Sequence, residues 1–326
     1  MFKKICNTHK RFSKTVNYRT FVKKINISDI SNVYHNEINN SVKKLNFKPK
    51  LVSFLCSNDP GAIQYAKWTQ NTCFKLGINF ELKKINKNDL EKNIIKANND
   101  SNINGIMVYY PCFGTKPSFY GDTMDNYLRD TVSYKKDVEG LCYMYRNNLY
   151  HNKRFIDNYN KNKSILPCTP LGIIKILESD LLAIYNKKLT KNKQLTNKII
   201  TVINRSTVVG HPTAAMLAND GADVYSVDLD SIYLMKKGQI IDTDYTLDKA
   251  CKISDVIISG VPDRNFLIDP LWIKPHTTII NVSPYNNLDI NKVNHIKGIK
   301  YVQQVGSVTV AMLMRNLITL INNYQI

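Results

Sequence analysis

The sequence predicts an α/β protein of two domains, each built around a parallel sheet, with a cleft between them. The first observation is the length, because 326 residues suit two domains of about 100–200 residues each. The second is the composition, since 43% of the residues are hydrophobic and can bury a large core. The third is the order of elements, in which short apolar runs alternate with helical patterns, as is typical of parallel sheets.

The first series of elements occupies residues 29–165 and predicts an N-terminal three-layer α/β domain. Strands are expected at 51–56, 78–82 and 105–109, and helices at 60–75 and 89–98. Asp59 followed by Pro60 is typical of a helix N-terminus. Asn88 is expected to cap the second helix, with Asn86 as the alternative.

The second series occupies residues 166–306 and predicts another α/β domain. Strands are expected at 199–203, 223–227, 255–259, 277–282 and 299–303, and helices from about 168 to 178 and at 207–219. A long amphipathic helix is expected at 307–324, and we assign the segment 307–326 to the first domain.

The net charge of +19 is concentrated partly at the front, where eight of the 45 basic residues precede the first acid, Asp29. Residues 1–28 therefore form a basic leader, and its hydroxyl and aromatic residues are typical of a mitochondrial transit peptide. An ordinary basic tail has the same composition, so the mitochondrial matrix is expected and the cytoplasm stays open, as does cleavage of the leader. The remaining charge follows a bias toward Lys and Asn, and its functional alternative is attraction of a polyanion.

Cysteine and histidine usage indicates free thiols and no metal site. The seven cysteines include no C-x-x-C pair, which favours a reducing compartment. The six histidines are scattered without the spacing of metal ligands. No apolar run approaches the ~18–20 residues of a membrane helix, so we expect no membrane association.

Residues 199–228 read as a dinucleotide-binding unit of strand, turn, helix and strand. The segment lacks G-x-G-x-x-G, but Asn204 in the turn tolerates the left-handed conformations that glycine usually supplies. The helix start, with Arg205 and Ser206 as side-chain donors, is expected to bind a pyrophosphate. Asp228 suits the ribose hydroxyls and repels a 2′-phosphate, so we expect NAD rather than NADP.

Two strand ends complete the predicted cofactor site. Val227 precedes Asp228 at the end of the second strand, and Ser259, Gly260 and Val261 close the third. Ligands of such sheets bind at the carboxyl ends of the strands, where a glycine lets a cofactor approach the backbone. A simple tight turn at Gly260 is the alternative.

Six segments, in order and spacing, resemble the methylenetetrahydrofolate dehydrogenase/cyclohydrolase family. They are Asn58–Tyr65 (NDPGAIQY), Gly105–Val108 (GIMV), Lys136–Gly140 (KDVEG), Leu166–Pro170 (LPCTP), Arg205–Gly210 (RSTVVG) with Pro212, and Gly306–Met314 (GSVTVAMLM). The resemblance covers the sequence from about residue 29 onward. It implies a folate-binding catalytic domain, a Rossmann NAD-binding domain, an active-site cleft between them, and a homodimer formed through the cofactor domain.

Three departures from the family pattern bear on activity. Bifunctional members carry Tyr-x-x-x-Lys, whose lysine is the cyclohydrolase residue, but here Tyr65 is followed by Thr69, and Lys67 lies about 200° away around the helix. The family's cleft glutamine is Tyr109 here, and the aspartate of Lys-Asp-Val-Asp-Gly is Glu139. The sequence thus resembles the monofunctional branch, which implies oxidation of 5,10-methylenetetrahydrofolate to 5,10-methenyltetrahydrofolate by hydride transfer to NAD, without cyclohydrolase activity.

The resemblance also implies the roles of the site residues. Tyr65, Glu139, Cys168 and Thr169 are assigned to catalysis, and Tyr65, Thr69, Tyr109 and Glu139 to substrate binding. Glu139 would bind the pterin edge and stabilise the developing cation, and Tyr65 would stack on or orient the folate. Cys168 precedes a helix, whose dipole favours a thiolate, so a direct chemical role stays open beside lining of the cleft. The alternatives are a surface-turn acid at 139 and a core tyrosine at 65.

Two other functions remain to be weighed. A bifunctional dehydrogenase/cyclohydrolase is disfavoured by Thr69 and Tyr109. A basic nucleic-acid-binding or folate-binding protein without catalysis is the alternative of another class, but nucleic-acid binding would need a basic face interleaved with aromatics. The resemblance further implies one-carbon metabolism and purine biosynthesis, with tetrahydrofolate derivatives, polyglutamylated or not, as ligands. The direction of the reaction and any effect of phosphate or magnesium stay open.

Overall fold

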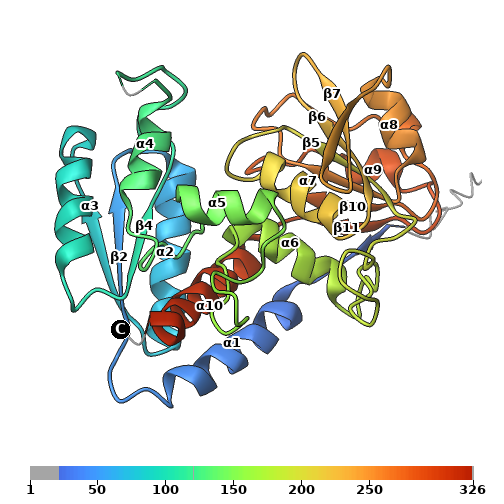
Figure 1. Ribbon diagram of the computed structural model, residues 1–326. Helices are drawn as coiled ribbons and strands as arrows, with labels where there is room; N and C mark the ends of the chain where they lie inside the picture. Colours follow the sequence, from blue (N-terminus) through green and yellow to red (C-terminus); the bar gives the residue numbers. More distant parts are fainter. Residues whose placement is uncertain (1–21, 120, 325–326) are drawn as a thin grey trace, which may run out of the picture.

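The computed structural model describes residues 22–119 and 121–324, and it has two lobes, each with its own sheet (Figure 1). The first lobe contains a three-stranded sheet and the second an eight-stranded sheet. Long helices cross the space between the lobes (Figure 1). The predicted two-part α/β fold is confirmed.

The first lobe has the strand order β3-β2-β4, with all strands parallel. Its strands are β2 (Lys50–Leu55), β3 (Asn79–Lys84) and β4 (Gly105–Val108), and its helices are α2 (Pro60–Lys75), α3 (Leu90–Asn99) and α4 (Met124–Thr131). Leu51, Val52 and Phe54 of the central strand are fully buried. Helices cover both faces of this sheet, so β2 reads as a continuous apolar run rather than an alternating one.

One of the two predicted helix caps is wrong. Asp59 caps α2 as predicted, since its Oδ2 accepts the N–H of Ala62 at 2.7 Å. Asn88 caps no helix; instead the Oδ1 of Asn86 accepts the N–H of Asn88 at 3.0 Å. The chain enters α3 through a single 3₁₀ turn, η1 (Lys87–Asp89), which moves the cap back by two residues.

The second lobe has the strand order β1-β11-β10-β9-β5-β6-β7-β8. Its strands are β1 (Lys23–Lys24), β5 (Ile199–Ile203), β6 (Asp223–Val227), β7 (Ile232–Lys236), β8 (Gln239–Asp242), β9 (Val256–Ser259), β10 (Thr278–Asn281) and β11 (Lys300–Val302). Its helical elements are α7 (Gly210–Asn219), α8 (Leu247–Ile253), η2 (Pro270–Trp272) and α9 (Ile290–Val293). The strands from β1 to β6 are parallel, and the hairpin β7–β8 adds an antiparallel edge. Every residue of β8 is exposed, so the strand has no burial pattern by which the sequence could reveal it.

Four helices connect the lobes. They are α1 (Ser28–Val42), α5 (Tyr143–Tyr150), α6 (Cys168–Glu178) and α10 (Gly306–Tyr324). Helix α10 packs against α1, α2 and α6. Its residues from Val308 to Met314 are all buried, so this stretch of the predicted amphipathic helix has no solvent-exposed face. Within the described residues, no helix has both the length and the apolar composition needed to cross a membrane.

The predicted leader, residues 1–28, is too long. Strand β1 pairs in parallel with β11, and the N–H of Lys23 donates to the carbonyl of Ile299 at 2.8 Å. Val22 and Ile25 are buried in the second lobe, so residues 22–28 belong to the fold. The rest of the predicted leader lies outside the described residues.

Candidate active site

A cavity of about 560 Å³ lies between the lobes. The predicted residues that line it are Tyr65, Tyr109, Glu139, Cys168 and Thr169. The second lobe contributes Val208, Val209, Val282, Ser283 and Pro284 to the opposite wall. Residues from different motifs, which are far apart in the sequence, therefore meet in one cleft.

Glu139 lies in the cleft on a tightly fixed loop. Its Oε2 accepts the N–H of Val108, at the end of β4, at 3.2 Å. The pKa of Glu139 is raised from 4.5 to about 8, mainly by burial and next by the charge of Asp137, while the Val108 N–H and Arg129 act to lower it. A carboxyl group with a strongly raised pKa in a cleft is typical of a functional site rather than of a surface turn.

Asp137 holds the loop that carries Glu139. Its carboxylate accepts three backbone N–H groups, from Glu139 at 3.1 Å, Gly140 at 3.0 Å and Cys142 at 2.8 Å. Gly140 has a φ of +66°, and a Cβ there would lie 2.9 Å from the carbonyl carbon of Leu166. The turn after Glu139 therefore needs glycine both for its conformation and for its close approach to the next segment.

Tyr65 and Tyr109 form an aromatic corner of the cleft. Their rings meet edge to face with centroids 5.9 Å apart. Thr69 lies behind this corner, fully buried, and its hydroxyl donates to the carbonyl of Tyr65 at 2.9 Å. Thr69 does not line the cavity, so its predicted contact with substrate is not part of this geometry. Burial raises the pKa of Tyr109, whose phenol lies beside the hydroxyls of Thr69 and Ser53.

Cys168 lines the cleft as a neutral thiol. Its Sγ donates to the carbonyl of Val138 at 3.3 Å. Burial raises its pKa well above 9, and the charges of Glu139 and Asp137 raise it further. The helix dipole at the start of α6 favours a thiolate, but burial and the two neighbouring carboxyl groups outweigh it, which agrees with the role of Cys168 in lining the cleft. Thr169, the next residue, contributes to the wall of the cavity.

Asn316 was not predicted, although it ties the site together. From the buried helix α10 its Nδ2 donates to the carbonyls of Val138 and Leu166, both at 2.9 Å. These bonds fasten the Glu139 loop to the segment before Cys168. The available signal was an asparagine flanked by the apolar residues of the helix, since a buried amide must find hydrogen-bond partners.

The turn predicted to bind the cofactor lies between β5 and α7 and comprises residues 204–209, here called the cofactor turn. Asn204 has a φ of +83°, and its Nδ2 donates to the carbonyl of Gly260 at 2.7 Å. A second cavity of about 80 Å³ lies at the carboxyl ends of β5 and β9 and is lined by Asn204, Ser206, Gly210 and Gly260. Val282, Ser283 and Pro284 line both this cavity and the cleft, so the two adjoin.

Ser206 caps helix α7 rather than pointing freely outward. Its Oγ accepts the N–H groups of Val209 at 3.3 Å and Gly210 at 3.2 Å. The helix predicted at 207–219 therefore begins only at Gly210, because residues 207–209 form a turn around this hydroxyl. The hydroxyl hydrogen is still available to a ligand.

Arg205, predicted to donate to a pyrophosphate, is held by the end of β6 and the segment between β6 and β7. Its guanidinium donates to the Oγ and carbonyl of Ser226 and to the Oγ and carbonyl of Ser231, at 2.6–3.1 Å. It also stacks over the ring of Tyr233, 4.5 Å from the centroid. The side chain fixes the β6–β7 connection beside Asp228, whose own carboxylate is exposed.

The other residues predicted to bind the cofactor mainly shape the ends of β6 and β9 through hydrogen bonds within the protein. The carbonyl of Val227 accepts the N–H of Asn204 at 3.0 Å, while the Val227 side chain is buried. The Oγ of Ser259 is bonded to Asn287 at 2.8 Å, and the Val261 N–H donates to the same Asn287 oxygen at 3.2 Å. Ser259 and Val261 thus shape the strand end through Asn287, and Gly260 is the residue of this group that lines a cavity.

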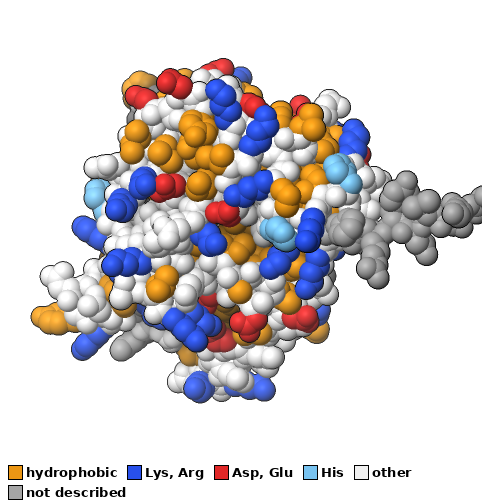
Figure 2. All heavy atoms as spheres, turned by 90° about the vertical axis from the view of Figure 1, so that its right-hand side faces the viewer, with side chains coloured by type: hydrophobic (Ala, Val, Ile, Leu, Met, Phe, Trp, Pro, Cys, Tyr) orange, Lys and Arg blue, Asp and Glu red, His pale blue; other side chains and the backbone are white. Residues whose placement is uncertain are grey.

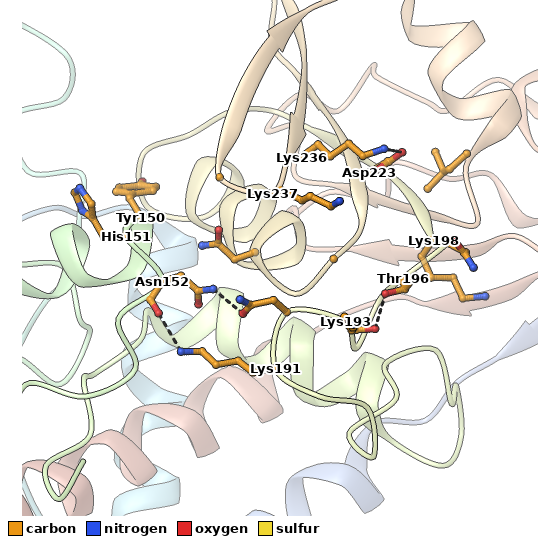
Figure 3. A pocket seen from close by; sticks show the side chains of 16 residues that line it. Tyr150, His151, Asn152, Lys191, Lys193, Thr196, Lys198, Asp223, Lys236 and Lys237 are labelled. Atoms are coloured by element: carbon orange, nitrogen blue, oxygen red, sulfur yellow. Dashed lines mark hydrogen bonds and ion pairs between the residues drawn. The ribbon is translucent and has the colours of Figure 1, made fainter. Parts of the chain in front are cut away.

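A larger hollow, of about 1090 Å³, lies at the opposite edge of the second sheet, where β5 and β6 begin (Figure 3). Its basic lining residues are Lys191, Lys193, Lys198, Lys236 and Lys237, with Lys236 paired to Asp223 at 2.8 Å. None of the predicted site residues lines it. Helix α7 ends here at Asn219, and lysines beside a helix C-terminus complement its dipole. Among the described residues, no group of three or more His, Cys, Asp or Glu side chains could hold a metal ion.

Comparisons with known proteins cover both lobes. Residues 25–139 match a family model described as tetrahydrofolate dehydrogenase/cyclohydrolase, catalytic domain, and residues 167–325 match the NAD(P)-binding domain of the same family. A methylenetetrahydrofolate dehydrogenase [NAD(+)] of Schizosaccharomyces pombe is 44% identical over 307 residues, which span 92% of each chain. One of Dictyostelium discoideum is 43% identical and spans 92% of this chain and 94% of its own.

Solved structures agree with the sequence matches. The NAD-dependent 5,10-methylenetetrahydrofolate dehydrogenase of Saccharomyces cerevisiae superposes with a TM-score of 0.84 at 42% identity, over 93% of this chain and 98% of that one. A bifunctional methylenetetrahydrofolate dehydrogenase/cyclohydrolase of Campylobacter jejuni has a TM-score of 0.73 at 21% identity, over 93% and 99%, and shares the fold.

Proposed function

The chain belongs to the tetrahydrofolate dehydrogenase/cyclohydrolase family, and from this premise we propose that it oxidises 5,10-methylenetetrahydrofolate to 5,10-methenyltetrahydrofolate with NAD and does not hydrolyse the product. One observation carries the proposal. The cleft that holds Tyr65 and Glu139 adjoins the cavity at the cofactor turn, so a folate and a dinucleotide can meet at one point. The NAD(+)-dependent relatives at 42–44% identity support the same reaction.

The residues of the second lobe suit NAD. The left-handed Asn204 leads into residues 205–208, whose backbone N–H groups would bind a diphosphate before α7 begins at Gly210. Asp228 lies at the end of β6, where a carboxylate accepts hydrogen bonds from the ribose hydroxyls. The same carboxylate repels the 2′-phosphate of NADP, and Arg205, which could attract that phosphate, is already bonded to four acceptors.

The first lobe positions the folate and stabilises charge. When bound, the nicotinamide accepts the hydride that leaves the methylene bridge. The remaining amidinium-like cation is stabilised by its own two nitrogens, so the protein needs no strong base. Glu139 would lie against the pterin, and arrival of the positive charge favours its ionised form. The Tyr65–Tyr109 corner would orient the ring system, and Cys168 and Thr169 would close the wall on the nicotinamide side.

The same corner accounts for loss of the hydrolytic activity. Activation of water against the methenyl carbon in bifunctional members uses a lysine at the position of Thr69. Thr69 is uncharged, fully buried and bonded to the carbonyl of Tyr65, so it can neither reach the cleft nor exchange a proton there. A bifunctional enzyme is therefore the weaker alternative.

The proposal is tested by one assay with three readouts. We expect rapid reduction of NAD and little reduction of NADP when 5,10-methylenetetrahydrofolate is supplied. Added methenyltetrahydrofolate should decay no faster than in buffer. Enzyme-dependent decay would show a retained hydrolytic activity, and reduction of neither nucleotide would refute the dehydrogenase.

We further propose a homodimer formed through the second lobe. The hairpin strand β8 is an open sheet edge, and Ile240 and Ile241 on it are 60% and 42% exposed. An apolar edge strand is a template for pairing with another copy. Light scattering should give twice the chain mass, and Ile241→Lys should reduce it. Leu271→Lys, at an exposed aliphatic residue away from β8, serves as the control.

Binding of nucleic acid is not favoured. On the face shown in Figure 2, lysine and arginine side chains are scattered between hydrophobic and uncharged ones rather than gathered into one stripe. Binding through a phosphate-tracking surface weakens steeply between about 50 and about 200 mM salt. We expect turnover to change only modestly over the same range, because the proposed substrates are small molecules.

For the cell, we propose a mitochondrial enzyme of one-carbon metabolism that supports purine biosynthesis. The support is compositional: the sequence before Val22 is basic and lacks acids. The targeting signal must end before Val22, since β1 belongs to the fold. Residues 1–21 fused to a fluorescent protein should direct it to mitochondria, and a diffuse signal would leave the cytoplasm as the location.

A further inference from the structure

A buried arginine links the two lobes beside the cleft. Arg129, on α4 of the first lobe, is 7% exposed. Its Nη1 donates to the Oγ1 of Thr207 at 3.2 Å, and Thr207 directly follows Ser206 in the cofactor turn. The same Nη1 donates to the Oδ1 of Asn126 at 2.5 Å. The bond to Thr207 joins residues 78 positions apart and fastens the cofactor turn to the folate-binding lobe.

The guanidinium also packs on the cleft's aromatic segment. It lies 4.9 Å from the ring centroid of Tyr110, the neighbour of Tyr109. Tyr110 itself lines the cleft. One side chain therefore touches both Tyr110, on the wall of the cleft that belongs to the first lobe, and Thr207, in the cofactor turn.

The positive charge of Arg129 is not neutralised by an ion pair. None of the ion pairs among the described residues involves it, and its Nε is buried without a hydrogen-bond partner. Burying an unpaired guanidinium is costly, and a Met or Leu would fill the space more cheaply if packing were the sole requirement. The charge is felt in the cleft, where it favours the ionised form of Glu139.

We propose that Arg129 is a positioning residue for hydride transfer, which sets the distance between the folate cleft and the cofactor turn and supplies the positive charge that faces Glu139. This rests on the proposed function. A shift of about 1 Å between reacting groups can lower a rate by about 100-fold, so one cross-lobe contact is enough to matter. Charged and titratable groups that face Glu139 are Asp137 on its own loop, Arg129 on α4, Tyr65 on α2, Tyr109, Tyr110 and Cys112 after β4, and Cys168 on α6.

Three variants separate the effect of the spacing between the lobes from the effect of the positive charge of Arg129. Arg129→Met removes the bond and the charge, Arg129→Lys keeps the charge and loses the planar fork, and Thr207→Val removes only the cross-lobe bond. Arg315→Met is the matched control. Arg315 is on α10, pairs with Glu37 of α1 at 2.8 Å and does not line the cleft. We would measure kcat, KM for NAD, the pH profile of kcat/KM, and the isotope effect with folate deuterated at the methylene bridge.

We expect Arg129→Met to lower kcat/KM by roughly 10–100-fold and to raise the isotope effect, because hydride transfer becomes slower than product release. In the pH profile of kcat/KM, the acidic limb of Arg129→Met should move to higher pH, because the pKa of Glu139 rises when a neighbouring cation is lost. Thr207→Val and Arg129→Lys both keep the positive charge at position 129. Each should therefore raise the isotope effect and leave the acidic limb of the pH profile unchanged. Arg315→Met should behave as the wild type.

Two outcomes would overturn the inference. If Arg129→Met lowers only the melting temperature and leaves the isotope effect and the pH profile unchanged, Arg129 is a structural residue. Equal effects of Arg129→Met and Arg315→Met would have the same meaning. If the wild type itself reduces no NAD, the proposed function has failed instead, and the affinity of the same variants for NAD still tests the link to the cofactor turn.

Discussion

The carbonyl oxygen of Asn204 lies 1.8 Å from the position that a Cβ on Gly210 would occupy. The left-handed Asn204 and the first residue of α7 are thus in contact across the cofactor turn. No side chain at 210 fits without moving the backbone of the turn, although Gly210 is not itself in a left-handed conformation.

Gly210→Ala is therefore expected to weaken NAD binding by at least about 10-fold and to lower the free energy of unfolding by about 2 kcal/mol, a typical cost of overpacking. Isothermal calorimetry and denaturant titration measure the two effects. Gly172→Ala is the control: its Cβ would meet Thr309 at an ordinary 3.5 Å, so the helix should gain stability from alanine. Equal behaviour of the two variants would contradict the role of the turn.

Ionisation of Glu139 should make kcat/KM depend on pH, with lower values on the acidic side. Its pKa is raised to about 8 in the free protein, and the proposed role needs the carboxylate, so kcat/KM should rise with pH toward a plateau above about 8. Glu139→Gln should lower the plateau by about 100-fold and abolish the limb. A limb that persists in Glu139→Gln would belong to another group.

The same shift predicts a change in stability with pH. A carboxyl whose pKa is raised on folding favours the folded state when it is protonated, below pH 4.5, and this contribution is lost as pH rises through about 8. The free energy of unfolding of wild type minus that of Glu139→Gln should accordingly fall between about pH 5 and about pH 9. Urea titrations at several pH values measure it, and a difference independent of pH would contradict the raised pKa.

Asp228 should decide the choice of cofactor. Asp228→Ser removes the acceptor for the ribose hydroxyls and the charge that repels a 2′-phosphate. A hydrogen bond to a charged group contributes about 1.5–3 kcal/mol, so the ratio of kcat/KM for NAD over NADP should fall by about 10–100-fold. Asp230→Ser, at an exposed acid two residues away, should leave the ratio unchanged.

Restoring lysine at position 69 should not by itself restore hydrolysis. Thr69 is fully buried behind Tyr109, so Thr69→Lys would bury an unpaired charge at a cost on the order of 3 kcal/mol. Adding Tyr109→Gln makes room and should recover part of this loss. Thermal melts and the decay of methenyltetrahydrofolate test both steps, with Gln70→Lys as an exposed control on the same helix. Full stability of the single variant would contradict the packing argument.

Cys168 should tolerate substitution. As a buried neutral thiol it lines the cleft, so Cys168→Ala should slow turnover by less than about 3-fold and cost about 1 kcal/mol of stability. Steady-state kinetics and melting curves measure this. If turnover instead falls by about two orders of magnitude, as is typical when an acid–base group is removed, the thiol takes a direct part in the reaction.

The local features of the fold could be predicted because their signals are local. Asp59 with Pro60 marks a helix start, and the strand–turn–helix pattern around Asn204 marks a cofactor turn without its usual glycines. The hairpin β7–β8 could not be predicted, because the exposed strand β8 has no apolar face to create a period. The start of α7 was predicted too early, since a hydroxyl cap at Ser206 holds the preceding turn out of the helix.

The site residues that lie on family motifs were predictable, but their partners were not. The meeting of Tyr65, Glu139 and Cys168 follows from those motifs, and the structure brings them together. The hydrogen bonds of Arg205 to Ser226 and Ser231 could not be predicted, because the direction of a side chain depends on its neighbours in the fold. Arg129 and Asn316 act through contacts with residues 78 and 178 positions away, which no local pattern contains.

The position of α10 has a consequence for biosynthesis. Met312 and Leu317 of this helix share a core with Leu51 of β2, although the helix begins nearly 200 positions after β4 ends. On the ribosome, the three-stranded sheet emerges long before the helix that covers it. Its apolar face must therefore stay exposed, or be shielded by a chaperone, until the cofactor lobe has also been translated. Nascent chains arrested before residue 306 should expose this face to proteases and hydrophobic dyes, whereas chains released after residue 324 should not.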